Sequence, residues 1–386
     1  MDGTLGPAPE RPARLHLDKA QLGQVVLVLQ GGGALGAYQA GVYQALDEAG
    51  VEPDWVIGTS IGAINAGIIA GNRPGTRLSR LREFWDRVHH DPVTQMVADM
   101  PIWGPFAANA LTVFGGLPRF FAPNPWAFLG LGLTPETAAY YSTAPLEATL
   151  AGLIDTDVLA SSAMRLTVGA ANVRTAEMRY FDSRDMPLST RHIMASGALP
   201  PAFPAVRIDG ELYWDGGILS NTPVEAVFDD NPRRSGLVFT VNIWQPHGPE
   251  PSDIARVLSR QKDLQYASRA TAQVVRQKQI HRLRHVIAEL VRELPESRRN
   301  DPEVRKLAAH GCLTRMHVVR LLAPMLSGEG HTKDIDFSAS GIHSRWQAGY
   351  ADALRVLEQQ PWTHEFDPIE GFIMHDTEAG TIVREG

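Results

Sequence analysis

A serine flanked by glycines stands between a short apolar run and a stretch of small residues. Residues 54–57 predict a buried strand, Gly58-Thr59-Ser60-Ile61-Gly62 follows it, and residues 63–71 predict a helix. A G-x-S-x-G pattern in this setting forms a strained turn that lifts the serine hydroxyl clear of the sheet, and its glycines avoid clashes there. The helix dipole at this point favours developing negative charge. The pattern predicts Ser60 as a nucleophile, and a tight turn with an N-cap serine is the alternative.

Consecutive glycines follow the first predicted strand of the chain. The valine-rich run 24–29 leads into Gly31-Gly32-Gly33-Ala34-Leu35-Gly36, and residues 37–49 then predict a helix. Consecutive glycines leave backbone N–H groups free to point at one spot, which makes an anion-binding site. In acyl transfer such a loop is an oxyanion hole, which holds the charged oxygen of the tetrahedral intermediate.

The same loop also matches the dinucleotide fingerprint G-x-G-x-x-G. That fingerprint requires an acidic residue at the end of the second strand, where it binds the ribose hydroxyls. Here the acidic residues Glu52 and Asp54 stand at the beginning of that strand. The sequence therefore disfavours dinucleotide binding.

An aspartate followed by two glycines ends a later predicted strand. Residues 211–214 follow a hairpin turn at Asp209-Gly210 and lead into Asp215-Gly216-Gly217. An ordinary aspartate is a weak base with a pKa of about 3.9, and burial would raise that pKa. Asp215 is thus a candidate base for Ser60 without a histidine. A turn aspartate that satisfies loop amides is the alternative.

Histidine and metal chemistry have weaker support. Nine histidines follow Asp215, so a Ser–His–Asp triad is an alternative, but none stands in a recognisable catalytic context. Asp334-Ile335-Asp336 begins like a calcium loop, but Ala339 occupies the position where glycine is required. No His-Glu-x-x-His or Cys/His spacing occurs, and the single cysteine cannot form a disulfide within the chain. We predict no metal and no cofactor.

The elements that must position these residues alternate between strands and helices. This alternation is typical of a parallel sheet with crossover helices. Further predicted elements are a helix over 76–90, paired strands over 165–173 and 178–182, a helix over 188–198 and a strand over 237–244. After residue 249, helical spacing predicts one long helix or a kinked pair over 252–294, and helices over 301–326 and 343–358.

Taken together, the three motifs resemble the patatin-like phospholipase family. Residues 195–200 (ASGALP) and 221–223 (NTP) also resemble it, and the resemblance covers about residues 24–245. It implies an α/β three-layer sandwich with a mostly parallel central sheet. It also implies a Ser60–Asp215 dyad. The implied oxyanion hole comprises Gly31, Gly32, Gly33 and Ala34, and the implied supporting glycines are Gly36, Gly58, Gly62, Gly216 and Gly217.

The activity implied by this resemblance is hydrolysis of lipid carboxylic esters. An acyltransferase using the same acyl-enzyme is one alternative, and a membrane-associated binding protein without turnover is another. Many members carry Arg or Lys where this chain has Leu35. The oxyanion site therefore has less cationic help here, but the dyad is unaffected.

The composition divides the chain into three parts. We predict a mobile N-terminal tail over 1–22, a patatin-like catalytic domain over 23–245 and a mainly helical C-terminal extension over 246–386. Within the second part, residues 101–133 contain seven aromatic residues and the single charge of Arg119. This segment predicts a lid or acyl-chain wall, with ordinary core or an oligomer contact as alternatives.

Charge and hydropathy indicate the class of partner. The formal net charge of −7 argues against nucleic acid, because phosphate binding needs a basic surface. No apolar run of membrane-spanning length and no signal peptide are visible. We therefore expect a cytoplasmic protein, with peripheral contact at the inner membrane left open. Residues 256–284 hold eight Lys/Arg and one acidic residue, which fits a solvated helix face or a membrane-surface helix.

Overall fold

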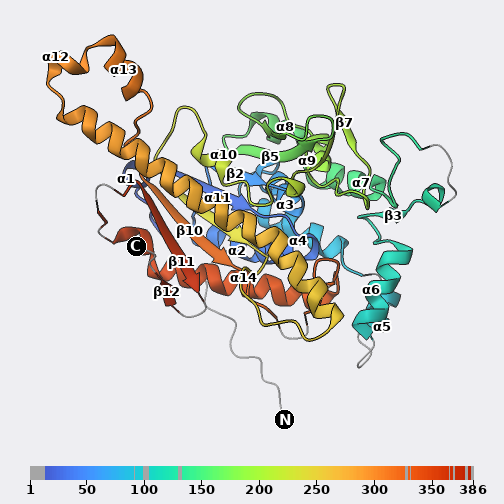
Figure 1. Ribbon diagram of the computed structural model, residues 1–386. Coiled ribbons are helices and arrows are strands. Elements are labelled where there is room, and N and C mark those ends of the chain that lie inside the picture. The colour runs from blue at the N-terminus through green and yellow to red at the C-terminus, as the bar shows by residue number, and fades with distance from the viewer. Residues whose placement is uncertain are drawn as a thin grey trace.

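The computed structural model describes residues 14–90, 92–98, 104–128, 133–326, 329–330, 332–364, 366–367, 370–378 and 381–383. Within them, ten strands form one mixed sheet (Figure 1). Its order is β12 (Thr381–Val383), β11 (Phe372–Glu378), β10 (Met316–Leu322), β9 (Gly236–Asn242), β1 (Gln24–Leu29), β2 (Trp55–Gly58), β5 (Arg165–Asn172), β8 (Glu211–Asp215) and β7 (Val206–Ile208). β6 (Met178–Asp182) pairs with β5.

The middle of this sheet is parallel. β11, β10, β9, β1, β2 and β5 run in one direction, whereas β12, β6, β8 and β7 pair antiparallel with their neighbours. Leu29 at the end of β1 lies opposite Gly58 of β2 and Val241 of β9. The carboxyl ends of the parallel strands therefore meet at one edge, where ligands of such sheets bind.

Helices cover both faces of the sheet. Val25, Leu27 and Leu29 of β1 belong to one apolar cluster, together with residues of α2 (Ala37–Glu48), α3 (Ile61–Ala70), α4 (Arg77–Arg87) and α14 (Ala339–Gln359). The alternate residues Val26 and Val28 belong to a second cluster with residues of α10 (Glu225–Phe228), against which α11 (Ile254–Glu293) packs Val274. This alternation follows from the period of two in a strand. The predicted three-layer α/β sandwich is thus confirmed.

The remaining elements lie mainly around the sheet edges. The helices are α1 (Lys19–Leu22), α5 (Pro92–Ala98), α6 (Gly104–Gly115), α7 (Ala144–Leu153), α8 (Thr156–Ser161), α9 (Thr190–Ser196), α12 (Glu296–Arg299) and α13 (Pro302–Ala308). Short 3-10 turns are η1 (Gly33–Gly36), η2 (Pro125–Phe128), η3 (Gly216–Ile218) and η4 (Pro361–Thr363). A separate two-stranded sheet joins β3 (Ala122–Pro123) to β4 (Tyr141–Ser142).

The C-terminal part is helical, as expected, but it also extends the central sheet. The helix predicted over 301–326 is wrong beyond residue 308, because 316–322 forms β10 between β9 and β11. Its sequence MHVVRLL contains two adjacent β-branched residues, which favour a strand. The long helix predicted over 252–294 is confirmed as the single 40-residue helix α11.

Close packing joins α14 to α2 in the N-terminal part of the chain. A Cβ on Gly41 of α2 would lie 1.9 Å from the carbonyl oxygen of Trp346, and one on Gly349 would lie 2.0 Å from that of Tyr38. Only glycine permits so close a helix contact. The indole of Trp346 also donates to Gln44 at 2.6 Å. α2 thus packs directly on α14, although the two are far apart in sequence.

The N-terminal region is described from residue 14 onward. The amide of Leu15 donates to the carbonyl of Ala49, and Lys19–Leu22 form α1, so residues 14–22 pack on the folded domain. The rest of the predicted tail lies outside the described residues. Among the described helices, none combines the length and the hydropathy that crossing a bilayer requires.

Candidate active site

Ser60 occupies the sharp turn between β2 and α3. Its φ of 58° and ψ of −126° lie in a region that side chains rarely adopt, which marks stored backbone strain. A Cβ on Gly62 would stand 2.3 Å from the carbonyl oxygen of Leu29, and one on Gly58 would stand 2.3 Å from that of Gly62. Neither position has room for a side chain, so the turn that presents Ser60 depends on both glycines.

A buried serine holds the backbone of this turn. The Ser60 amide donates to the hydroxyl of Ser196 at 3.1 Å, and that hydroxyl donates to the Gly169 carbonyl at 2.6 Å. Ser196 ends α9 and lies in the ASGALP stretch. This stretch therefore fastens the Ser60 turn to β5, a role that the motif alone did not reveal.

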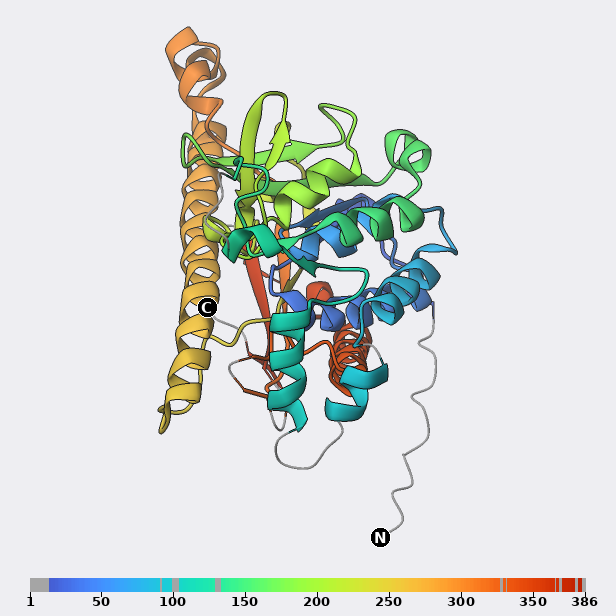
Figure 2. The ribbon, with the colours of Figure 1, turned by 90° about the vertical axis from the view of Figure 1, so that its right-hand side faces the viewer.

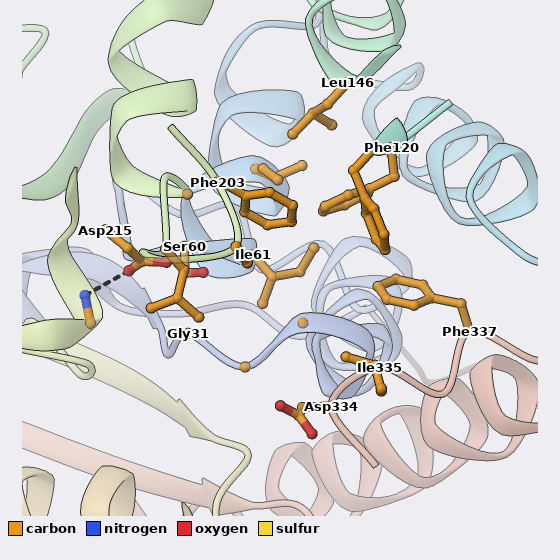
Figure 3. A pocket seen from close by; sticks show the side chains of 18 of the residues that line it. Gly31, Ser60, Ile61, Phe120, Leu146, Phe203, Asp215, Asp334, Ile335 and Phe337 are labelled. Carbon is orange, nitrogen blue, oxygen red and sulfur yellow. Dashed lines mark hydrogen bonds between the residues drawn. The ribbon is translucent and has the colours of Figure 1, made fainter. Parts of the chain in front are cut away.

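Asp215 ends β8, directly beside Ser60 (Figure 3). Its side chain is buried and accepts a hydrogen bond from the Gly217 amide at 2.7 Å, and it lies near enough to the Ser60 hydroxyl for that group to favour the ionised carboxylate. Burial raises the pKa of Asp215 from 3.8 to about 6, although the nearby Ser60 hydroxyl and the Gly217 amide act to lower it. A carboxylate with this pKa is ionised at neutral pH and is a stronger base than an exposed aspartate.

Gly216 lets the Asp215 strand end approach β5 closely. A Cβ on Gly216 would lie 2.4 Å from the carbonyl oxygen of Gly169, the same carbonyl that Ser196 holds. The Gly169 carbonyl of β5 therefore contacts both Ser196, which holds the Ser60 turn, and Gly216, which follows Asp215. The relative position of the two side chains is fixed by the central sheet rather than by a mobile loop.

The predicted oxyanion loop is held at both ends. The Gly31 amide donates to the Asn221 carbonyl at 3.1 Å, and the Gly31 carbonyl accepts from the Asn221 amide group at 3.0 Å and from the Trp244 indole at 2.7 Å. The Ala34 amide donates to the Asp334 carbonyl at 2.9 Å. The N–H groups of Gly31 and Ala34 are therefore already engaged.

Gly32 and Gly33 differ from their neighbours in this respect. Within the described residues, neither of their N–H groups has a hydrogen-bond acceptor. Gly33 has a φ of 56°, and a Cβ there would lie 2.2 Å from the Asp334 carbonyl oxygen, so this position needs glycine. Both glycines line the same cavity as Ser60 and Asp215. They are the two loop amides still able to bind an anion.

Two ion pairs secure the segment that packs on this loop. Lys262 of α11 contacts the Asp334 carboxylate at 2.7 Å, and Lys333 contacts Asp263 of α11 at 2.7 Å with both side chains buried. The carbonyl that accepts from Ala34 is thereby tied to the long C-terminal helix. The sequence reasoning treated Asp334 only as part of an incomplete calcium loop, and no local signal pointed to this contact.

The cavity above Ser60 is apolar and has a volume of about 180 Å³. Figure 3 shows Ser60 and Asp215 together, with Phe203, Phe120 and Phe337 gathered beside them. The ring centroids of Phe120 lie 5.6 Å from Phe337 and 6.2 Å from Phe203. Three distant segments thus build one wall, which suits an acyl chain better than a polar group.

The aromatic segment 101–133 contributes to this wall. Phe120 and Phe121 line the cavity and are 7% and 8% exposed, so they are packed as core residues as well. In the same segment, Phe114 of α6 is 83% exposed. The interpretations as core and as acyl-chain wall therefore overlap at Phe120 and Phe121. Residues 101–103 and 129–132 lie outside the described residues.

Histidine and metal ligands are absent from the described part of this site. None of the described residues that line the cavity is a histidine. The described ranges also hold no group of three side chains suited to a metal ion. Asp334 and Asp336 instead pair with Lys262 and Arg345.

Comparison with protein families identifies two matching models. Residues 27–228 match the model described as patatin-like phospholipase, which is more than half of the chain. Residues 264–369 match a second model, described as patatin phospholipase. The second match covers most of α11 and all of β10 and α14, which lie outside the three sequence motifs.

The chain is also similar to individual curated proteins and to one solved structure. The chain is 24% identical over 261 residues to lysophospholipase nte1 of Aspergillus terreus, and 30% identical over 223 residues to human patatin-like phospholipase domain-containing protein 6. These matches cover 61% and 56% of the chain but only 14% of each relative. The crystal structure of VipD from Legionella pneumophila aligns over 87% of this chain and 67% of its own, with 16% identity and a TM-score of 0.36.

Proposed function

Because the chain belongs to the patatin-like phospholipase family, we propose that it hydrolyses carboxylic esters of lipids through Ser60 and Asp215. The observation that carries the proposal is the buried Asp215 carboxylate, which lines the same cavity as Ser60 and stands beside the strained turn that presents it. The apolar cavity directly above these residues supports a lipid acyl chain as the group to be bound.

In the first half of the reaction, the Ser60 hydroxyl oxygen attacks the acyl carbonyl carbon as Asp215 accepts the hydroxyl proton. The carbonyl oxygen becomes an oxyanion, and the free N–H groups of Gly32 and Gly33 donate to it. When the intermediate collapses, the bond to the alcohol breaks and Asp215 returns the proton to the departing oxygen. The products are an acyl-Ser60 ester and a free alcohol.

The second half repeats the same proton transfers with water. Asp215 takes a proton from water, the water oxygen attacks the acyl carbonyl, and the bond to the Ser60 oxygen breaks. The serine oxygen recovers the proton from Asp215, and the fatty acid leaves. One base thus serves both halves because its pKa of about 6 lets it accept and release protons near neutral pH.

The glycine-loop amides divide into two roles under this proposal. Gly32 and Gly33 are the oxyanion donors, since the amides of Gly31 and Ala34 are occupied by Asn221 and Asp334. Losing one donor of this kind typically raises the barrier by about 3 kcal/mol. Leu35 adds no charge to the site, so the stabilisation comes from backbone N–H groups.

The test measures how fast the full chain and its variants release fatty acid from a lysophospholipid. Ser60→Ala should abolish release, and Asp215→Asn should reduce it by several orders of magnitude. Replacing any one histidine after Asp215 by alanine should cost far less. A histidine variant as inactive as Ser60→Ala would replace the dyad with a triad.

A further inference from the structure

Helix α11 carries exposed apolar side chains on one side, over residues 254–264 and again over residues 275–290. In Figure 1 it crosses in front of the sheet, and in Figure 2 it forms one edge of the molecule. At 3.6 residues per turn, the exposed apolar residues fall within about one third of the helix circumference. We name this row the α11 stripe, and it comprises Ile254, Val257, Leu258, Leu264, Val275, Leu283, Val286 and Leu290.

The opposite side of α11 faces the protein and is largely polar. Its buried residues include Asp263, Gln277, His281 and His285. A surface helix of a globular protein normally turns its apolar side inward. Here the polar side faces inward, and Ile254 and Leu283 of the stripe are 75% and 64% exposed. Exposed apolar side chains aligned on one side of a helix in this way mark an interaction surface.

Basic side chains border the stripe on both sides. By helical position, Arg276 lies along one border, and Lys278 and Arg282 lie along the other. None of these three has an ion-pair partner within the described residues. α11 has nine basic and three acidic residues, in a chain whose net charge is −7. Three of the nine basic residues of α11 thus lie at the borders of the exposed apolar row.

We propose that the α11 stripe docks on an anionic lipid bilayer, lying in the plane of the interface. An apolar row with cationic borders fits acyl chains below and lipid phosphates at the sides. A second copy of the chain fits less well, because pairing two stripes would bring the arginine borders of one helix against those of the other. Gln261, Gln265 and Gln279 interrupt the row but carry no charge.

Docking in this orientation would place the cavity close to lipid. Tyr266 of α11 lines the cavity, and its ring lies 4.8 Å from that of Trp244, another lining residue. The same helix therefore forms part of the cavity wall and presents the stripe to solvent. This inference deepens the proposed function and rests on it for the lipid nature of the surface.

The test is flotation of the full chain with vesicles. The protein should bind vesicles of phosphatidylcholine with about one third phosphatidylglycerol, bind phosphatidylcholine alone far less, and lose binding at high salt. Arg276→Glu/Arg282→Glu and, separately, Leu283→Gln/Val286→Gln should each lower the partition coefficient at least roughly tenfold. The matched control is Arg73→Glu/Arg80→Glu, in which Arg73 precedes α4 and Arg80 lies within it. This control variant should bind vesicles like the original chain.

Two further measurements separate the outcomes. The α11 variants should hydrolyse a soluble butyrate ester at the rate of the unaltered chain. If the unaltered chain does not hydrolyse this ester, the proposed function is contradicted, but the docking proposal is not affected. Undiminished vesicle binding by both α11 variants would overturn docking through this stripe. So would a dimer in sedimentation that either α11 variant dissociates, since the stripe would then be an interface between copies.

Discussion

The burial of Asp215 should make the active site a measurable source of instability. Its pKa is higher in the folded chain, at about 6, than the ordinary value of 3.8. The folded state therefore binds the proton more tightly than the unfolded state. The stabilisation from protonated Asp215 is fully present below pH 3.8 and is lost as the pH rises through 6. Asp215→Asn removes this dependence because an amide does not titrate.

The magnitude follows from the two pKa values. At about 1.36 kcal/mol per pH unit, a rise from 3.8 to about 6 costs the folded protein about 3 kcal/mol at pH 8. About half of that cost is present at pH 5. The entropy of unfolding is roughly 2.1 cal/mol/K per residue, over 386 residues. With this entropy, removing the cost at pH 8 by Asp215→Asn should raise the Tm by roughly 4 °C.

The assay is thermal unfolding of the original chain and Asp215→Asn between pH 5 and pH 8. The matched control is Asp209→Asn, the same chemical change at an exposed hairpin position. The difference in Tm between Asp215→Asn and the original chain should widen with pH, whereas the control should not widen it. If the Tm difference instead stays constant or narrows with rising pH, burial does not raise the pKa of Asp215 in the folded chain.

Other expectations follow from the same site. Turnover of a soluble ester should rise with pH through about 6, because only ionised Asp215 accepts the proton, and a pH profile of kcat/KM checks this. Phe120→Leu should lower the ratio of long-chain to short-chain kcat/KM about tenfold, if roughly two methylenes lose contact at about 0.8 kcal/mol each. Exposed Phe114→Leu should leave that ratio unchanged. Lys262→Met should lower kcat up to about tenfold with little change in KM, since it loosens the segment that holds the oxyanion loop, whereas Lys306→Met, in an exposed ion pair, should not. Excess EDTA should leave turnover intact, and loss restored by calcium would count against the dyad.

Local signals in the sequence were enough to place the candidate residues Ser60 and Asp215 at the ends of their strands. The Ser60 turn depends on its own glycines and on the strand before it, so the pentapeptide and its context predicted it. Asp215 was recognisable because a strand end followed by two glycines is itself a local pattern. The parallel strands β1, β2 and β9 were apolar runs of the expected length.

Contacts between distant segments were beyond such reasoning. Which loop amides remain free depends on Asn221 and Asp334, which lie far along the chain from the glycines. The wall of the cavity likewise combines Phe120 with Phe337. The strand at 316–322 was missed because apolar residues at helical spacing extended the preceding helix in the prediction. Pairing with β9 and β11 decides its structure instead.

The central claim, that Ser60 is the nucleophile activated by Asp215, is tested most directly by covalent labelling. A fluorophosphonate probe reacts with activated serines, and peptide mass spectrometry locates the adduct. We expect one adduct on Ser60, no labelling of Ser60→Ala, and much slower labelling of Asp215→Asn. An adduct on another serine, or labelling of Asp215→Asn at the rate of the original chain, would contradict the dyad.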